Sequence, residues 1–307
     1  MNRVVLFSDV HGNIVGLREI FREIVKLENV MYIVCCGDYF GYDAGADDVF
    51  DLFDKFNVIM LKGDHEEYLV KLNNDEKSKM PHQIINETYD WLRLNLSQEN
   101  FNRLLNLKTN CSIKLNHEYS LYACHAGPDN LSSRTCATDV PIRKLRETYS
   151  NLEENIVVFG HHHTHHILLM DNKLLINCAS VGMRKNDDIC SYTIIEYDEE
   201  KIVILQKSFE YNIDEAEKLA VMIFYSVINS CCLKCVFIFI FHVWCMKCIW
   251  PYSPQRFPVA FYYCSLVFLR QQPLCQFRMN TRPTNSHLPD IYSPICRCPS
   301  ENFIFFN

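Results

Sequence analysis

The sequence predicts an α/β protein built as a four-layer αββα sandwich of two mixed β-sheets. Three observations support this fold. Apolar runs of strand length alternate with stretches of helical periodicity near the N-terminus, which is typical of parallel β-α-β units. The second half carries further short apolar runs separated by turn residues, which indicates a strand-rich region. A hydrophobic content of 49% over 307 residues is enough for a large buried core.

The N-terminal part alternates strands and helices. β-branched and aliphatic residues predict strands, and apolar residues three and four apart predict one apolar face of a helix. The order is strand Arg3–Ser8, helix Leu17–Val25, strand Met31–Cys36, helix Asp47–Phe56 and strand Val58–Leu61.

Residues 66–107 are polar and have helical periodicity, which predicts a helical insertion. We expect this insertion to cap the site at the ends of these strands. After it we predict a meander of strands at Cys111–Leu115, Tyr119–Cys124, Ile156–Phe159, Ile167–Met170, Lys173–Asn177, Tyr192–Tyr197 and Lys201–Gln206. A final helix begins at Asn212, since Glu215 three places on completes a capping box.

The composition changes near residue 218, which predicts a catalytic domain of residues 1–218 and a separate tail of residues 219–307. The first part has a net charge of −12 and the tail +5, in agreement with −7 for the whole chain. The tail holds 9 of the 16 cysteines and 8 of the 11 prolines but none of the 9 glycines. It does not look like a continuation of the same domain, and we expect a readthrough or out-of-frame extension.

Two other interpretations of the tail stay open. Its two C-x-x-C pairs, Cys232/Cys235 and Cys245/Cys248, could bind zinc, although the apolar spacer between them is shorter than in a zinc ribbon. Residues 219–246 are apolar enough for membrane contact, although Lys234 near the middle would be costly there.

Charge and cysteine usage restrict the function further. No cluster of lysine and arginine is long enough to follow a phosphate backbone, so general nucleic-acid binding is not expected. An anionic substrate would need metal ions instead. The N-terminus lacks a secretory signal pattern, which favours a cytoplasmic, reducing location with free thiols.

Polar motifs follow the predicted strands directly. Since ligands bind at the carboxyl ends of strands in open α/β sheets, these motifs should converge. They are Asp9-Val10-His11, Gly37-Asp38, Gly63-Asp64-His65-Glu66, His125 and Gly160-His161-His162-His163. A lone Asp-x-His or Gly-Asp is more often turn chemistry, but five motifs in this order are not coincidence. Four imidazoles and three carboxylates suit Mn, Fe, Zn, Ni or Co better than Ca.

In this order the motifs resemble the calcineurin-like metallophosphoesterase superfamily, whose pattern is D-x-H, G-D, G-N-H-[DE], H and G-H-x-H. The single-domain bacterial and archaeal phosphodiesterases look closest. The similarity extends from Met1 to about Leu219, and Asn177–Gly182 resembles the N-P-G-S-V-G turn of that family, with Cys178 and Ala179 in place of its Pro and Gly.

The resemblance implies two divalent ions, with Mn²⁺ expected first and Fe, Zn, Ni, Co or Mg as alternatives. One ion would be held by Asp9, His11, Asp38 and His163, and the other by Asp38, Asp64, His125 and His161. A hydroxide held between them would attack phosphorus in line. His65 would be catalytic, stabilising the transition state or protonating the leaving oxygen, with Glu66 as its orienting partner.

Two features of the motifs depart from a simple match. Asp64 stands where the superfamily has asparagine, so the site gains a negative charge, and we assign Asp64 a catalytic as well as a ligand role. The histidine run also allows a second register, His163-Thr164-His165, but Gly160 favours His161 and His163. His162, His165 and His166 are interpreted as solvated or strand-face residues, and His82 and His117 stay unassigned.

The expected function is hydrolysis of a small phosphate ester, nucleotide-derived esters being one class, by a phosphodiesterase. Two alternatives remain. One is a catalytically weak scaffold or protein-interaction module of the same fold. The other is a phosphomonoesterase or protein phosphatase. Phe40-Gly41-Tyr42 argues against a protein phosphatase, because that branch has D-R-G at these positions. Residues 66–107 and 128–149 are expected to set the substrate preference.

Overall fold

A computed structural model gives the structure of the chain. It describes residues 1–41, 45–74, 89–93, 95–136, 138–182, 190–216 and 218–219, together with two short strands near the C-terminus. The chain divides into two compact units, Met1–Trp244 and Cys245–Asn307. The second unit contains the antiparallel pair β11 (Arg297–Cys298) and β12 (Glu301–Asn302). The described residues do not test the other predictions for the tail, which are zinc binding by its cysteine pairs, membrane contact by residues 219–246 and a domain boundary at residue 218.

The N-terminal sheet has five strands in the order β10-β9-β1-β2-β3. Their bounds are β1 Asn2–Phe7, β2 Val30–Cys35, β3 Ile59–Met60, β9 Cys190–Tyr197 and β10 Ile202–Phe209. β1, β2 and β3 are parallel, as the alternating pattern predicted, and β9 and β10 form antiparallel pairs beside them. The crossover helices are α1 (Ile14–Ile24) and α2 (Asp47–Lys55).

The second sheet also has five strands, in the order β4-β5-β6-β8-β7. Their bounds are β4 Asn110–Lys114, β5 Ser120–Cys124, β6 Ile156–Phe159, β7 His166–Met170 and β8 Lys173–Asn177. The short helix η1 (Arg134–Cys136) and α6 (Ile142–Tyr149) lie between β5 and β6.

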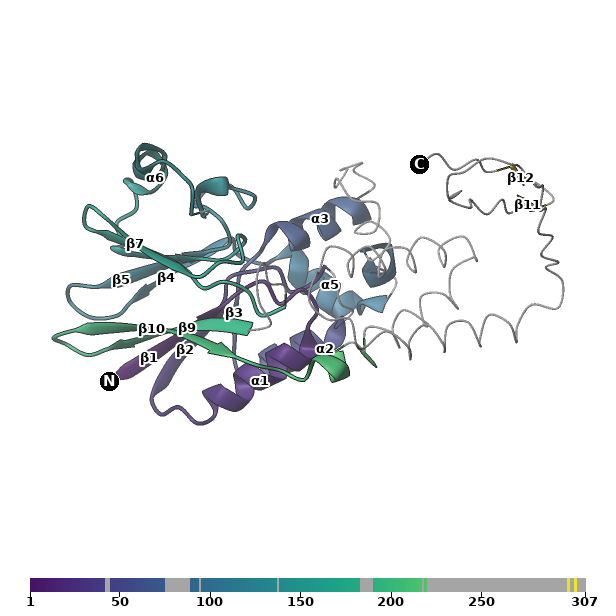
Figure 1. Ribbon diagram of the computed structural model, residues 1–307, viewed down its shortest axis with the longest axis horizontal. Coiled ribbons are helices and arrows are strands. Elements are labelled where there is room, and N and C mark those ends of the chain that lie inside the picture. The colour runs from purple at the N-terminus through teal and green to yellow at the C-terminus, as the bar shows by residue number, and fades with distance from the viewer. Residues whose placement is uncertain are drawn as a thin grey trace, which may run out of the picture. The chain divides into compact units, whose positions relative to one another are not determined.

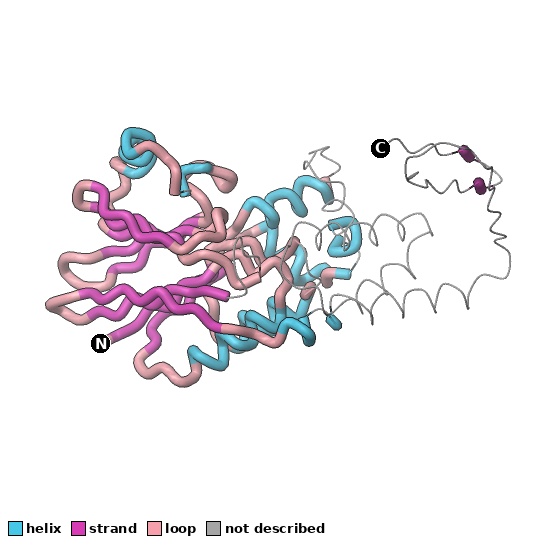
Figure 2. Tube along the Cα trace, in the orientation of Figure 1, coloured by secondary structure: helices cyan, strands magenta, loops and turns pink. Residues whose placement is uncertain are grey.

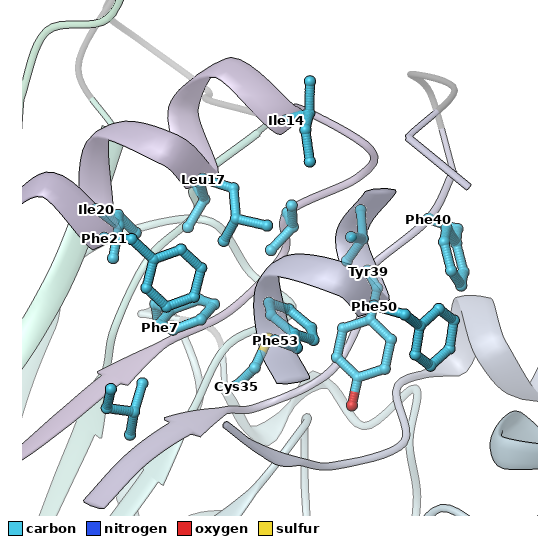
Figure 3. Close-up of a cluster of buried hydrophobic side chains, with 14 of the residues drawn as sticks. Phe7, Ile14, Leu17, Ile20, Phe21, Cys35, Tyr39, Phe40, Phe50 and Phe53 are labelled. Carbon is cyan, nitrogen blue, oxygen red and sulfur yellow. The ribbon is translucent and has the colours of Figure 1, made fainter. Parts of the chain in front are cut away.

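The predicted αββα layering is confirmed (Figure 1). One buried cluster lies between the two sheets and contains Val4 and Leu6 of β1 together with Val158 of β6. A second cluster joins the outer face of the second sheet to α6. The third lies between the N-terminal sheet and its helices (Figure 3). In it the ring centroid of Phe7 lies 6.1 Å from that of Phe21 and 5.9 Å from that of Phe53. Each sheet therefore packs against a buried apolar cluster on both faces.

The predicted meander of the second half is wrong as a whole, although β4–β5, β7–β8 and β9–β10 are antiparallel pairs of successive strands. A meander would pair successive strands antiparallel, whereas β5 pairs parallel with β6, and β6 pairs parallel with β8. α6 makes the connection from β5 to β6 a crossover instead of a hairpin, and the β7–β8 hairpin lies with β8, not β7, beside β6. The apolar residues of α6, Leu145 and Tyr149, are buried, but its many charged residues hid the helix from sequence reasoning.

The predicted insertion is helical where it is described (Figure 2). It contains α3 (Asp64–Asn73), helical residues 89–93 and α5 (Gln98–Leu105). α3 starts two residues earlier than predicted, so the Gly63-Asp64-His65-Glu66 motif forms the beginning of a helix. The final helix is also present: Asn212 Oδ1 accepts a hydrogen bond from the Glu215 N–H, as the capping pattern predicted.

No helix within the described ranges is both long and apolar enough to cross a membrane.

Candidate metal centre

The predicted ligand residues lie on loops that leave the carboxyl ends of five strands. The N-terminal sheet contributes the loops after β1, β2 and β3, and the second sheet those after β5 and β6. The residues on these loops are Asp9, His11, Asp38, His125, His161 and His163, and Asp64 is the first residue of α3, where the loop after β3 ends. Both sheets therefore supply the site, which lies at one end of the sandwich.

The first group of side chains joins the loops after β1 and β6. Asp9, His11 and His163 have ligand atoms within 4.8 Å of one another. His163 Nε2 lies 3.0 Å from Asp9 Oδ1 and 3.1 Å from His11 Nε2. This group has one carboxylate and two imidazoles aimed at a common point, an arrangement suited to a divalent transition ion.

The second group consists of Asp38, Asp64, His125 and His161. His125 Nε2 lies at its centre, 3.3 Å from Asp38 Oδ2, 3.2 Å from Asp64 Oδ1 and 3.1 Å from His161 Nδ1. At these distances the two ring nitrogens and the two carboxylates all face one point, as the ligands of one metal ion would.

Asp38 connects the two groups. Besides its place in the second group, it forms a third cluster with His11 and His65, again within 4.8 Å. Its carboxylate thus lies within reach of His11, which belongs to the first group, and of the other members of the second group. A carboxylate has two oxygens, so this position suits a bridge between two ions.

The backbone at the site is unusual. Five of the seven predicted ligand residues have positive φ, namely Asp9 at 56°, His11 at 49°, Asp38 at 56°, His161 at 61° and His163 at 56°. The left-handed region costs a residue with a side chain about 1–2 kcal/mol. Such conformations persist only where the surrounding structure enforces them, and they gather at functional sites.

Two glycines make room for the carboxylates. A Cβ atom at Gly63 would collide with the side chain and backbone N of Asp38, and one at Gly160 would collide with Ser8 and with Asp9 Oδ2. Because a carboxylate fills each of these spaces, we expect neither glycine to tolerate alanine.

Backbone carbonyls orient two of the imidazoles. Nδ1 of His11 lies 3.1 Å from the Phe40 carbonyl oxygen, and Nδ1 of His125 lies 2.9 Å from that of Cys36. A carbonyl can only accept, so Nδ1 carries the proton in both rings and Nε2 faces the cluster. Burial, together with the nearby His65 and His163, lowers the pKa of His11 to about 3, so its ring is neutral, as a ligand must be.

The carboxylates create a field that favours a cation. Burial alone would raise the pKa of Asp9, but the histidines around it, His163 first, hold that pKa below its ordinary value. Burial would likewise raise the pKa of Asp64, and hydrogen bonds with His125 and His161 outweigh it. Burial lowers the pKa of His125, yet Asp38 and Asp64 raise it well above the usual range. A divalent ion could replace the proton that this field retains, so the donor set fits metal ions.

Glu66, expected to orient His65, binds the backbone of two loops. Its carboxylate accepts hydrogen bonds from three backbone N–H groups, those of Asp38 (2.8 Å), Tyr39 (2.8 Å) and Gly63 (2.9 Å). It is fully buried, and burial followed by the charge of Asp38 raises its pKa to about 7. Glu66 thus holds the loops after β2 and β3 together.

Two polar contacts of the site were missed by sequence reasoning. The Tyr89 hydroxyl is hydrogen-bonded to Nδ1 of His65, and Ser132 Oγ donates to Asp64 Oδ2 over 3.2 Å. Both residues lie in the two segments expected to set substrate preference, but neither has a motif that could have identified it. His162, His165 and His166 are outside the ligand groups found among the described residues, and His82 is not described.

Comparison with known proteins gives one family and one fold. The family model for calcineurin-like phosphoesterases matches residues 2–194. A hypothetical protein from Pyrococcus horikoshii has a similar structure, with a TM-score of 0.66, 14% identity and coverage of 75% of this chain and 97% of that one. A metallophosphoesterase from Sphaerobacter thermophilus has a TM-score of 0.53 and 18% identity, covering 71% of this chain and 92% of that one. No curated protein sequence gives a significant match.

Proposed function

This chain belongs to the calcineurin-like phosphoesterase family and is a metal-dependent phosphoesterase, and on that basis we propose that it hydrolyses phosphodiesters at a centre of two divalent ions. The observation that carries the proposal is the convergence of four histidines and three aspartates, from both sheets, around Asp38. The substrate is a small phosphate ester.

The two groups of side chains support one ligand set each. The first ion would be held by Asp9, His11, Asp38 and His163, and the second by Asp38, Asp64, His125 and His161. Mn²⁺ is the expected ion, because mixed nitrogen and oxygen ligands with three carboxylates suit it. When bound, the ions would supply Lewis-acid activation of the phosphate and of water.

The residues of the chain itself orient the ester. His65 lies at the start of α3, and its Nε2 is 3.9 Å from Asp38 Oδ2, so the ring faces the cluster. There it can donate a hydrogen bond to an oxygen of the phosphate, where negative charge grows in the transition state. Asp64, His161 and His163 are the partly exposed members of the cluster, with side chains 14–24% accessible, and they mark the side from which the ester enters.

The charge of the site favours a diester over a monoester. In the described part of the chain, the ion-pair partners of Asp9, Asp38 and Asp64 are all histidines. Arginine is the side chain most often used to bind phosphate through two hydrogen bonds, so acids that pair only with histidines suit the single charge of a diester better than the two charges of a monoester dianion.

The proposal is tested with the full chain, stripped of metal and then loaded with Mn²⁺, Zn²⁺ or Mg²⁺. Hydrolysis of bis-p-nitrophenyl phosphate faster than that of p-nitrophenyl phosphate, and only with metal, is the expected result. A preference for the monoester would change the assignment to a phosphatase. Absence of turnover with every ion would favour the scaffold function instead.

Asp64→Asn is expected to raise turnover. Removal of one charge leaves the ions better Lewis acids and lowers the pKa of bound water. Metal affinity should fall by about tenfold, a typical size for changes beside a metal. Metal titration and pH-rate profiles measure both effects, with Asp139→Asn, an exposed carboxylate, as the control. A variant that is no faster at any pH would contradict the argument.

We also propose that residues 219–307 take no part in catalysis, because every proposed ligand lies before residue 164. Intact-mass analysis of the native protein tests this: a mass that ends near residue 220 would support it, and a functional defect on removal of the tail would oppose it.

A further inference from the structure

A buried hydrogen bond connects the helical insertion to the histidine that faces the metal cluster. The hydroxyl of Tyr89 is bonded to Nδ1 of His65. Tyr89 is fully buried and His65 is 8% exposed, so this bond does not compete with bulk water. It is therefore a contact of the folded protein between a residue of the predicted cap and a residue at the start of α3.

Packing fixes the position of both rings. The ring of Tyr68, one turn after His65 on α3, packs edge-on against Tyr89 with centroids 4.9 Å apart. On the other side, the ring of His11 lies 4.7 Å from that of His65. A Cβ atom at Gly41 would collide with the imidazole of His65, and Gly41 has a φ of +147°, so glycine is required there for the ring to fit. These contacts therefore hold the His65 ring in one orientation.

The bond to Tyr89 determines what the other ring nitrogen can do. A neutral imidazole has one donor and one acceptor nitrogen. The phenol hydroxyl can donate to Nδ1, and the proton of the ring is then on Nε2. Nε2 is the atom that lies 3.9 Å from Asp38 Oδ2, in the cluster of His11, Asp38 and His65. The donor therefore faces the place where the ester would bind.

We propose that Tyr89 is a positioning residue, whose hydroxyl donates to Nδ1 of His65 and so presents the Nε2–H of His65 to the phosphate. This rests on the proposed phosphoesterase function. Tyr89 itself does not touch the substrate. It lies in the segment expected to set substrate preference, so the cap also acts on the chemistry through this bond.

Tyr89→Phe removes only the hydroxyl. We expect kcat for bis-p-nitrophenyl phosphate to fall by about 10- to 100-fold, a size found when a supporting hydrogen bond to a site residue is lost. KM and the metal content should change little, because the ligands and the entrance are untouched. The matched control is Tyr192→Phe, since Tyr192 is a buried tyrosine that packs against Phe209 in the N-terminal sheet.

A spectroscopic measurement on the wild-type protein does not depend on how the variant folds. ¹⁵N NMR of the metal-free or Zn²⁺-loaded protein, with the His65 signals assigned by their loss in His65→Gln, should show a protonated Nε2 and an unprotonated Nδ1 that accepts a hydrogen bond. A protonated Nδ1 would overturn the proposal. If the wild type is active and Tyr89→Phe keeps its kcat, only this inference fails. If the wild type is inactive with every ion, the phosphoesterase proposal fails first.

Discussion

Replacement of Asp38 by alanine is expected to abolish metal-dependent hydrolysis. Asp38 is the only residue of the described ligand groups that belongs both to the second group and to the cluster with His11, so its loss affects both proposed ion sites. Changes of residues that merely support a ligand cost about 10- to 100-fold. Loss of the bridging carboxylate should cost more, and we expect turnover to fall by more than about 10³-fold.

The same variant makes a second, independent measurement available. Metal analysis after dialysis should find two ions per chain in the wild type and at most one in Asp38→Ala. Asp51→Ala is the matched control, because Asp51 is an exposed aspartate on α2 and should keep both activity and metal content. Two tightly bound ions in a folded but inactive Asp38→Ala protein would show that Asp38 acts in catalysis without bridging.

Glu66→Ala is expected to destabilise the fold severely. The variant would leave three buried N–H groups, those of Asp38, Tyr39 and Gly63, without their acceptor. Each unsatisfied buried group costs about 1–3 kcal/mol, so the free energy of unfolding should fall by about 3–9 kcal/mol. Since a typical domain is stable by only about 5–15 kcal/mol, much of the protein would be unfolded at physiological temperature.

Thermal and urea unfolding measure this effect. Glu66→Gln keeps one acceptor oxygen but places an NH₂ group against a backbone N–H, and should lie between the wild type and Glu66→Ala. Glu67→Ala is the matched control, because the Glu67 side chain is 43% exposed and pairs with Lys71 on the surface. Its effect should stay within about 0.5 kcal/mol. Equal stability of the Glu66 and Glu67 variants would contradict the role given to Glu66.

The parts of the fold that sequence predicts well are those with local signals. The first three strands have continuous apolar runs, and Val4–Phe7 of the first are wholly buried because both faces of the sheet are covered there. Each run ends in a polar motif, so the amino-acid sequence alone locates the loops of the site along the chain. Their convergence follows from parallel strands, which place their carboxyl ends at one edge.

Other features depend on contacts that have no local signal. The pairing of β9 with β1 joins residues about 190 positions apart, and nothing in either strand specifies its partner. α6 was missed because only two of its eight residues are buried. Glu66 looked like a partner for its neighbour His65, but α3 directs its carboxylate to the backbone of two loops instead.

The central place of β1 also has a consequence for synthesis of the protein. One edge of β1 is covered by β2, but the other must wait for β9, which begins at Cys190, and the sheet is complete only after Phe209. At about 5–20 residues per second, the nascent chain would present an unpaired, apolar edge for about 10–40 seconds. Chains stalled on the ribosome before β9 should thus be more sensitive to protease than chains in which β10 has emerged.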